Sequence, residues 1–357
     1  MMGPARAMIC PLVRAVDEVV QAAATAALIQ PDVRADVAAL ARRLPEAMHG
    51  FGFELRLAGD RQPVDFYTSV SAQGGGREVL GAFRSPAAAE SASAADVVGW
   101  DRVAAFARRW ADPSSALHAS VVTAFLEFDA PFAGARPPSL FARLDPPIGD
   151  GSQQWAAGGA VVDEIVALLL GRAIDPATRA TLIQVFTTLP PGGRVVDVAA
   201  MLPRGAAAVR VFVTLPRSGL LTYLRGLGYT DGLAALVSLP EALWHGHDHL
   251  SLQMDVAESI GARIGVELNG DASAPTSSRG WPVILRALRS AGLCSAAREA
   301  ALLAWPGAGP PRATAGAWPR QVVRVLSHVK LVIQPEQPVE AKAYLWATAR
   351  AAGLTWS

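Results

Sequence analysis

The segment Ser327–Trp346, S-H-V-K-L-V-I-Q-P-E-Q-P-V-E-A-K-A-Y-L-W, decides the fold because apolar and polar residues alternate on both sides of a short turn. Such alternation is typical of half-buried β-strands, since successive side chains of a strand point to opposite faces. Pro335 and Pro338 flank the turn, and proline is common in turns and disfavoured inside a sheet. We therefore expect a hairpin of two strands, Ser327–Gln334 and Val339–Thr348.

This hairpin carries Lys330 and Lys342, which are the only lysines among the 32 basic residues of the chain. A lysine ammonium is a compact charge on a flexible stem and does not substitute for the planar arginine fork. If both lysines face one side of the sheet, Lys330 lies opposite either Lys342 or Tyr344, because paired residue numbers must then add up to an even number. Two such ammonium groups repel unless an anion lies between them, and a diphosphate is one such anion. Two lysines that extend into water at the rim are the alternative.

The same alternation occurs in pairs along the rest of the chain, which predicts four further antiparallel hairpins. One of them turns through Pro203-Arg204-Gly205. With the terminal hairpin, we count ten strands in five hairpins. The first four pairs are Phe53–Ala58 with Val64–Val70, Val121–Asp129 with Ser139–Asp145, Val195–Leu202 with Ala208–Thr214, and Leu250–Val256 with Ala262–Asn269.

Alanine- and leucine-rich stretches precede each hairpin and are typical of helices. The clearest start is Asp175-Pro176, because aspartate caps a helix and proline suits its first turn. The expected helices are Val16–Ala27, Ala35–Leu44, Trp100–Trp110, Val161–Leu170, Pro176–Phe186, Gly219–Leu227, Asp231–Leu243, Pro282–Ser290 and Ser295–Trp305. A unit of helix, helix, strand and strand therefore occurs five times without a repeated sequence.

One face of nearly every strand is apolar, and the other face is polar or aromatic. The apolar positions, such as Leu55, Leu126, Val211, Leu252 and Val329, are expected to face the helices. The opposite faces carry Glu54, Arg56, Asp65, Tyr67, Glu127, Asp129, Arg143, Asp197, Arg210, Phe212, Gln253, Asp255, Arg263, Glu267, Lys330, Lys342, Tyr344 and Trp346. An open sheet with a solvated face is the alternative. Because aromatic residues lie among the charges, we predict an α+β fold: a closed ten-stranded antiparallel β-barrel of five hairpins, a polar lumen and an outer ring of helices.

Composition limits the function classes. The 357 residues are 51% hydrophobic and 18% charged, with a formal net charge of +1. This balance argues against a nucleic-acid-binding protein, which needs a basic surface. The apolar run Ala160–Leu170 is too short for a bilayer span, and the first residues lack a secretion signal. We expect one domain over residues 1–357, cytoplasmic, with no nucleic-acid or membrane partner.

Five such units around a ten-stranded barrel resemble the ABBA, or PT-barrel, prenyltransferases, which act on indoles, phenols and peptides. The local sequence A-K-A-Y-L at 341–345 is similar to the lysine-x-tyrosine strands of that family. The resemblance implies an isoprenoid diphosphate donor and an aromatic small molecule or peptide acceptor. It implies that Lys342 and Lys330, with the inward arginines, hold the diphosphate, and that aromatic side chains shield the allylic cation or bind the acceptor. The arginines are Arg56, Arg143, Arg210 and Arg263; the aromatic residues are Tyr67, Tyr344, Trp346 and Phe212.

The expected chemistry requires cations near the leaving group, aromatic faces near the allylic cation and a base near the acceptor. Glu127 and Glu54 are the candidate carboxylates for orienting or deprotonating the acceptor. The many other inward carboxylates exceed what a metal-free diphosphate pocket needs. They leave two further readings open, Mg²⁺ binding and recognition of a cationic acceptor.

A metal-dependent hydrolase or cyclase on the same barrel is a second hypothesis. The segment W-H-G-H-D-H at 244–249 brings three histidines together, although its spacing is one residue shorter than a zinc-hydrolase motif. The candidate ligands are His245, His247, His249, Asp255 and Glu267. A non-catalytic barrel that binds a peptide or small ligand is the third hypothesis, since a fold does not determine function.

Overall fold

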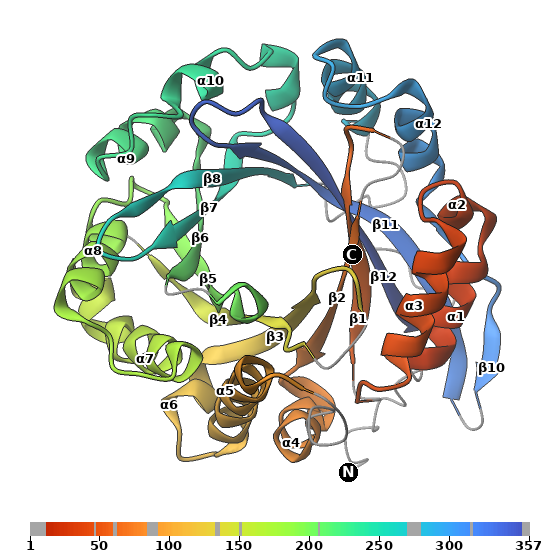
Figure 1. Ribbon diagram of the computed structural model, residues 1–357, viewed down its shortest axis with the longest axis horizontal. Coiled ribbons are helices and arrows are strands. Elements are labelled where there is room, and N and C mark those ends of the chain that lie inside the picture. The colour runs from red at the N-terminus through yellow and green to blue at the C-terminus, as the bar shows by residue number, and fades with distance from the viewer. Residues whose placement is uncertain are drawn as a thin grey trace.

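The computed structural model describes residues 12–45, 48–59, 63–83, 92–132, 136–149, 152–205, 208–269, 280–314 and 317–351. Its centre is an antiparallel β-sheet closed into a barrel, which Figure 1 shows nearly end-on. The barrel strands are β1 (Gly50–Arg56), β2 (Val64–Ser71), β3 (Val121–Phe128), β4 (Ser139–Gly149), β5 (Arg194–Ala200), β6 (Val209–Pro216), β7 (His249–Val256), β8 (Ile260–Asn269), β11 (Ala317–Ile333) and β12 (Glu340–Ala351).

Neighbouring strands follow chain order from β1 to β8, and β12 pairs with β1. Strand β11 closes the ring because it pairs with β12 on one side and with β8 on the other. Within the described residues, the predicted closed barrel of ten strands is confirmed. All five hairpin turns lie at one end of it, here called the hairpin end, and the helical connections lie at the other, the helix end.

Helices surround the barrel on the outside (Figure 1). They are α1 (Leu12–Gln21), α2 (Ala23–Ala26), α3 (Pro31–Ala41), α4 (Gly76–Ala82), α5 (Ala94–Ala111), α6 (Ala116–Ser120), α7 (Ser152–Leu170), α8 (Pro176–Thr187), α9 (Leu220–Gly226), α10 (Leu233–Val237), α11 (Trp281–Ser290) and α12 (Ala296–Ala304). The predicted cap of α8 is confirmed, since the Asp175 carboxylate accepts a hydrogen bond from the Thr178 amide at 2.8 Å. Among the described helices, none has the length and hydropathy that a bilayer span requires.

The last hairpin departs most from expectation. Strand β11 begins ten residues before the predicted Ser327, at Ala317. Its first half extends past the barrel and pairs there with two short strands, β9 (Gly307–Ala308) and β10 (Arg312–Thr314), which the sequence did not predict. Pro319 is the reason that this half-strand was not predicted, because proline argues against a central strand. Proline is nevertheless tolerated near the edge of a sheet. Pro240 likewise divides the predicted helix Asp231–Leu243 into α10 and a short 3₁₀ turn, Glu241–Trp244.

The hydrophobic core lies between the outer face of the barrel and the helices. The apolar strand positions predicted to face outward are buried in one continuous cluster with helical side chains such as Val16, Phe106, Ile165 and Leu285. A second, smaller cluster lies inside the barrel and comprises Phe141, Ala199, Met201 and Phe212. The predicted division of each strand into a helix-facing side and a lumen-facing side is therefore confirmed.

Candidate functional site

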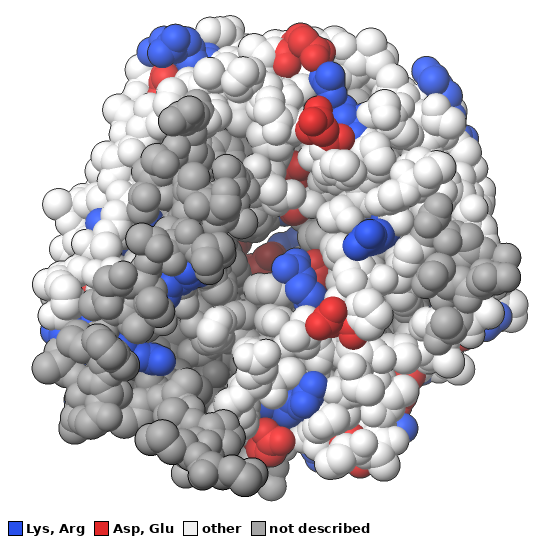
Figure 2. Space-filling model, turned by 180° about the vertical axis from the view of Figure 1, so that it is seen from behind, with Lys and Arg blue, Asp and Glu red and all other residues white. Residues whose placement is uncertain are grey.

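The lumen holds a chamber of about 670 Å³. Its lining comes from every barrel strand except β1. Figure 2, seen from the side opposite to Figure 1, shows an opening near the middle of the surface, with basic and acidic side chains around it. The volume falls in the range of small-molecule sites, about 300–1,000 Å³.

Aromatic rings form one wall of the chamber. Tyr67 stacks on Trp346 with ring centroids 5.5 Å apart, and Phe125 meets Trp346 edge-on at 6.5 Å. Phe141 and Phe212 pack at 5.6 Å in the same chamber. All four predicted aromatic residues therefore line the chamber: Tyr67, Trp346, Phe212 and Tyr344.

Two glycines of β1 make room for these rings. A Cβ at Gly50 would overlap the Trp346 indole, and a Cβ at Gly52 would overlap both the Tyr67 ring and the carbonyl oxygen of Leu345. The Tyr67 hydroxyl donates a hydrogen bond of 2.8 Å to that same carbonyl oxygen. Strand β1 thus has no side chain at its first two inward positions, and the neighbouring rings occupy that space.

Lys330 lines the chamber, and of the two pairings that the sequence left open, the register places Lys330 directly opposite Lys342. The anion between them is the carboxylate of Glu54. Lys342 Nζ lies 2.5 Å from Glu54 Oε1, and Lys330 Nζ lies 3.4 Å from Oε2. The Tyr344 hydroxyl donates to the same Oε2 and accepts from Lys330 Nζ. All four side chains are buried, so the alternative of two solvent-exposed lysines is wrong.

Burial by itself would raise the pKa of Glu54, but the charges of Lys330 and Lys342 and their hydrogen bonds hold it well below its ordinary value. Burial lowers the pKa of Lys330. Burial and the charge of Glu54 raise the pKa of Tyr344. The cluster is therefore a dry set of ion pairs in which Glu54 stays negative and Tyr344 stays protonated.

Glu127 has a different environment from Glu54. Burial, followed by the negative charge of Glu54, raises the pKa of Glu127 to about 7. Its only basic neighbour within ion-pair distance, in the part of the chain that the structure describes, is Arg204 at 3.5 Å. A carboxyl that titrates near neutral pH is suited to accept a proton. Of the two candidate bases, the geometry favours Glu127, because Glu54 is fully engaged by cations.

Arg204 is a cation at the hairpin end, beside Glu127, that the strand pattern did not predict. It lies in the β5–β6 turn and makes two hydrogen bonds to Asp129, at 2.6 and 2.9 Å, besides its contact with Glu127. Strand alternation does not reach turn residues. The only feature of the sequence that pointed to Arg204 was the predicted Pro203-Arg204-Gly205 turn, from which its guanidinium reaches Asp129.

Two of the four predicted diphosphate-binding arginines line the chamber, and two do not. Arg143 and Arg210 line the chamber, but each forms two hydrogen bonds to one carboxylate, Asp197 and Asp255 respectively, at 2.8–2.9 Å. Arg143 also covers the Phe125 ring at 5.2 Å.

The other two arginines lie outside the chamber, towards the hairpin end. Arg56 contacts Asp65 at 3.5 Å and Glu340 at 3.3 Å. Arg263 lies in a small hollow with Arg210 and Lys330, and within the described residues it has no ion pair. Burial and the nearby charge of Arg210 lower the pKa of Arg263.

A polar wall faces the aromatic one. On this wall Gln253 donates a hydrogen bond to Glu267, and Asn269 donates one to Ser251 at 2.9 Å. His328 stacks on Tyr344 with ring centroids 4.0 Å apart. Burial and then the charge of Lys330 lower the pKa of His328 to about 3, so this imidazole is neutral near pH 7.

The predicted metal ligands are not brought together. His247 lies outside the chamber and contacts the backbone carbonyls of His245 and Asn269. Asp255 is bound to Arg210, while Glu267 lies inside the chamber. Over the described ranges, no group of three or more His, Cys, Asp or Glu side chains is arranged to hold a metal. Among the described residues, the lumen carboxylates are bound to basic or amide side chains.

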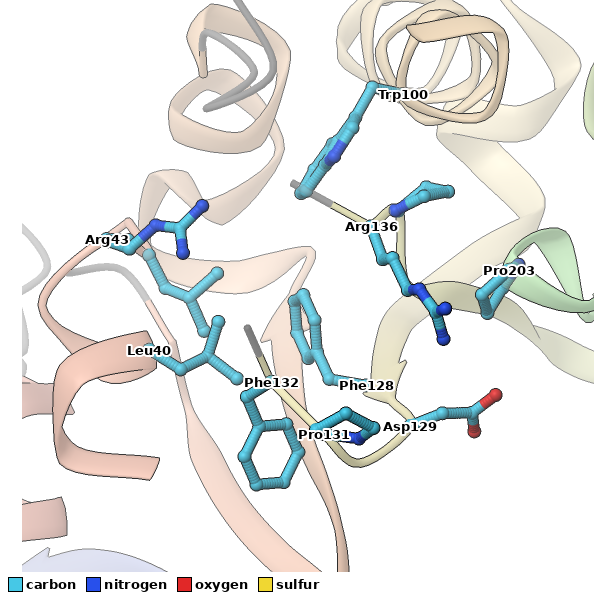
Figure 3. Close-up of a pocket in the computed structure, with 11 residues that line it drawn as sticks. Leu40, Arg43, Trp100, Phe128, Asp129, Pro131, Phe132, Arg136 and Pro203 are labelled. Carbon is cyan, nitrogen blue, oxygen red and sulfur yellow. The ribbon is translucent and has the colours of Figure 1, made fainter. Parts of the chain in front are cut away.

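A second hollow lies outside the lumen, between α3, α5 and the β3–β4 turn (Figure 3). Its volume is about 20 Å³, which is room for about one water molecule. Its lining includes Leu40, Trp100, Phe128, Phe132 and Arg136. The chamber in the lumen is therefore the candidate site.

The fold is similar to that of solved ABBA-type prenyltransferases. The 6-dimethylallyltryptophan synthase from Micromonospora olivasterospora, solved in complex with DMASPP and Trp, is 16% identical, covers 97% of both chains and has a TM-score of 0.51. AnaPT from Neosartorya fischeri is 14% identical, with a TM-score of 0.50 over 86% of this chain and 79% of that chain. No family model matches the chain, and neither does any curated protein. The shared feature is the PT-barrel fold.

Proposed function

We propose that this protein is a prenyltransferase, which transfers an isoprenoid group from an allylic diphosphate to an aromatic acceptor inside the barrel. The observation that carries the proposal is the chamber itself. It combines a wall of stacked aromatic rings with buried cations and a carboxyl whose pKa is about 7. The PT-barrel neighbour solved with DMASPP and Trp supports the same pairing of donor and acceptor.

The proposed roles follow from position. Ionisation of the donor develops negative charge on the diphosphate, and Lys330, Arg143 and Arg210 are the cations that line the chamber and stabilise it. Tyr67, Tyr344 and Trp346 offer π-faces to the allylic cation and keep water from it.

Loss of a proton from the alkylated ring completes the transfer. Glu127 lies on the same chamber and accepts this proton, because its pKa is near neutral. The acceptor is the aromatic ring of either a free small molecule or a peptide side chain.

The test is to incubate the protein with dimethylallyl or geranyl diphosphate and an acceptor, either free tryptophan or a peptide that contains tyrosine and tryptophan. Mass spectrometry should detect the added prenyl group, and parallel reactions with Mg²⁺ or with a chelator measure metal dependence. Lys330→Ala should reduce the rate, whereas Arg312→Ala, which removes an exposed arginine bound to Glu18 outside the barrel, is the matched control.

Other outcomes separate the remaining hypotheses. A barrel that only binds ligands should be stabilised thermally by an isoprenoid diphosphate without forming product. A metallohydrolase should contain bound metal by elemental analysis of the purified protein. The proposal is overturned if no isoprenoid diphosphate stabilises the protein and both Lys330→Ala and Lys342→Ala behave as the unmodified chain.

A further inference from the structure

The Glu54 carboxylate occupies the place that an anionic ligand of the two lysines would need. Its Oε1 faces Lys342 Nζ at 2.5 Å, and its Oε2 faces Lys330 Nζ at 3.4 Å and accepts from Tyr344. Two ammonium groups and a hydroxyl on one planar anion are also the donors that a phosphate group accepts. Lys330 and Tyr344 line the chamber as well, so the cluster adjoins the space available to a ligand.

Glu54 already compensates the charge of the lysine pair. The Glu54, Lys330 and Lys342 side chains are between 3% and 7% exposed, so water screens their interactions little. A diphosphate that approached these lysines while Glu54 stayed between them would bring like charges into contact in a dry site. That arrangement is strongly unfavourable, because a buried charge without a compensating partner destabilises a dry site.

The remaining cations of the chamber offer no simpler binding position. Arg143 is engaged by Asp197 and Arg210 by Asp255, each through two hydrogen bonds. Lys330 differs because its contact to the Glu54 carboxylate is long, at 3.4 Å, as is its contact to Gln253, and its short hydrogen bond goes to the uncharged Tyr344 hydroxyl. The lysine pair is therefore the place where an incoming anion gains most from replacing an internal carboxylate.

We propose that Glu54 is a displaceable internal counter-anion, which holds Lys330 and Lys342 in the empty barrel and competes with the diphosphate for them. This inference rests on the proposed function. Glu54 stabilises the barrel before the donor binds, and its return to the lysines after transfer expels the diphosphate product. Its role is to set the affinity of the diphosphate site, and it takes no part in bond making.

The test uses inorganic pyrophosphate as the probe, with isothermal titration calorimetry on the full chain. Glu54→Gln removes the charge and keeps the shape, so pyrophosphate should bind at least tenfold more tightly than to the unmodified chain. The matched control is Glu299→Gln, which makes the same change of net charge in an ion pair with Arg289 on the outer helices. This control should bind pyrophosphate as the unmodified chain does.

Thermal unfolding gives a second measurement. Without ligand, Glu54→Gln should melt at a lower temperature, and saturating pyrophosphate should raise its melting temperature more than that of the unmodified chain. If Glu54→Gln does not fold, Glu54→Asp serves instead, because the shorter side chain reaches the lysines less well. It should bind pyrophosphate more tightly than the unmodified chain.

Two results would decide against the inference in different ways. If the unmodified chain binds pyrophosphate and transfers prenyl groups, but the Glu54 variants bind pyrophosphate no more tightly, Glu54 is a fixed structural partner and only this inference fails. If pyrophosphate binds to none of the variants and no isoprenoid diphosphate is consumed, the proposed function fails with it.

Discussion

Replacement of Glu127 by glutamine should stabilise the barrel at pH 8 and change its stability much less at pH 5. Burial and the charge of Glu54 raise the pKa of Glu127 from 4.5 to about 7 in the folded protein. The folded state therefore holds this proton more tightly than the unfolded state. The resulting stability is present at low pH and is lost as the pH rises from 4.5 through about 7.

The magnitude follows from the two pKa values. At about 1.4 kcal/mol per pH unit, the interval from 4.5 to about 7 corresponds to roughly 3 kcal/mol. Glutamine does not titrate, so the variant should gain about that much relative to the unmodified chain between pH 5 and pH 8. Arg204 keeps its two hydrogen bonds to Asp129 in the variant, so no guanidinium is left without a partner.

The assay is urea unfolding followed by tryptophan fluorescence at both pH values. Glu54, Tyr67, Lys330 and Arg204 interact electrostatically with Glu127 and are present in both proteins, so the comparison at each pH reports the effect of replacing Glu127. Glu299→Gln, on the outer helices, should keep the pH dependence of the unmodified chain. The reasoning is refuted if Glu127→Gln changes the free energy of unfolding equally at pH 5 and pH 8.

Three further predictions test the site. Glu127→Gln should lower the rate of prenyl transfer by about 10²- to 10⁴-fold, and undiminished transfer by this variant would exclude Glu127 as the base. In the unmodified enzyme, kcat/KM should rise with pH through about 7, as the Glu127 carboxyl loses its proton. Lys342→Met should lower the free energy of unfolding in urea by about 3–5 kcal/mol, because Glu54 loses its closest cation. The double variant Lys342→Met with Glu54→Gln should lose less stability than Lys342→Met alone, which checks this reason. Gly50→Ala should fold, but it should displace the Trp346 indole and weaken acceptor binding about tenfold. Gly52→Ala should fail to fold, because its Cβ overlaps the backbone oxygen of Leu345. Identical circular dichroism spectra for the two variants would contradict this prediction.

The strand pattern was predictable because burial on one side of a sheet imposes a period of two on the sequence. The five hairpins and the lumen-facing positions followed from that period and from short turns, whereas the structure decided that Lys330 pairs with Lys342 and not with Tyr344. Strands β9 and β10 and the first half of β11 escaped prediction because they lie beyond the barrel, where one-sided burial no longer shapes the sequence. Arg204 was not predicted for a related reason, since residues of a turn do not follow the alternating pattern of a strand.

The sequence by itself determined which side chains enter the lumen, but it did not determine which of them meet. Glu54 is separated from Lys330 by 276 residues and from Lys342 by 288. Only closure of the ring, through the pairing of β1 with β12 and of β11 with β8, brings these side chains together. The sequence predicted an anion between two lysines because like charges repel. The tertiary structure decided that this anion is the chain's own carboxylate, since the pairing of β1 with β12 places Glu54 beside the lysine hairpin.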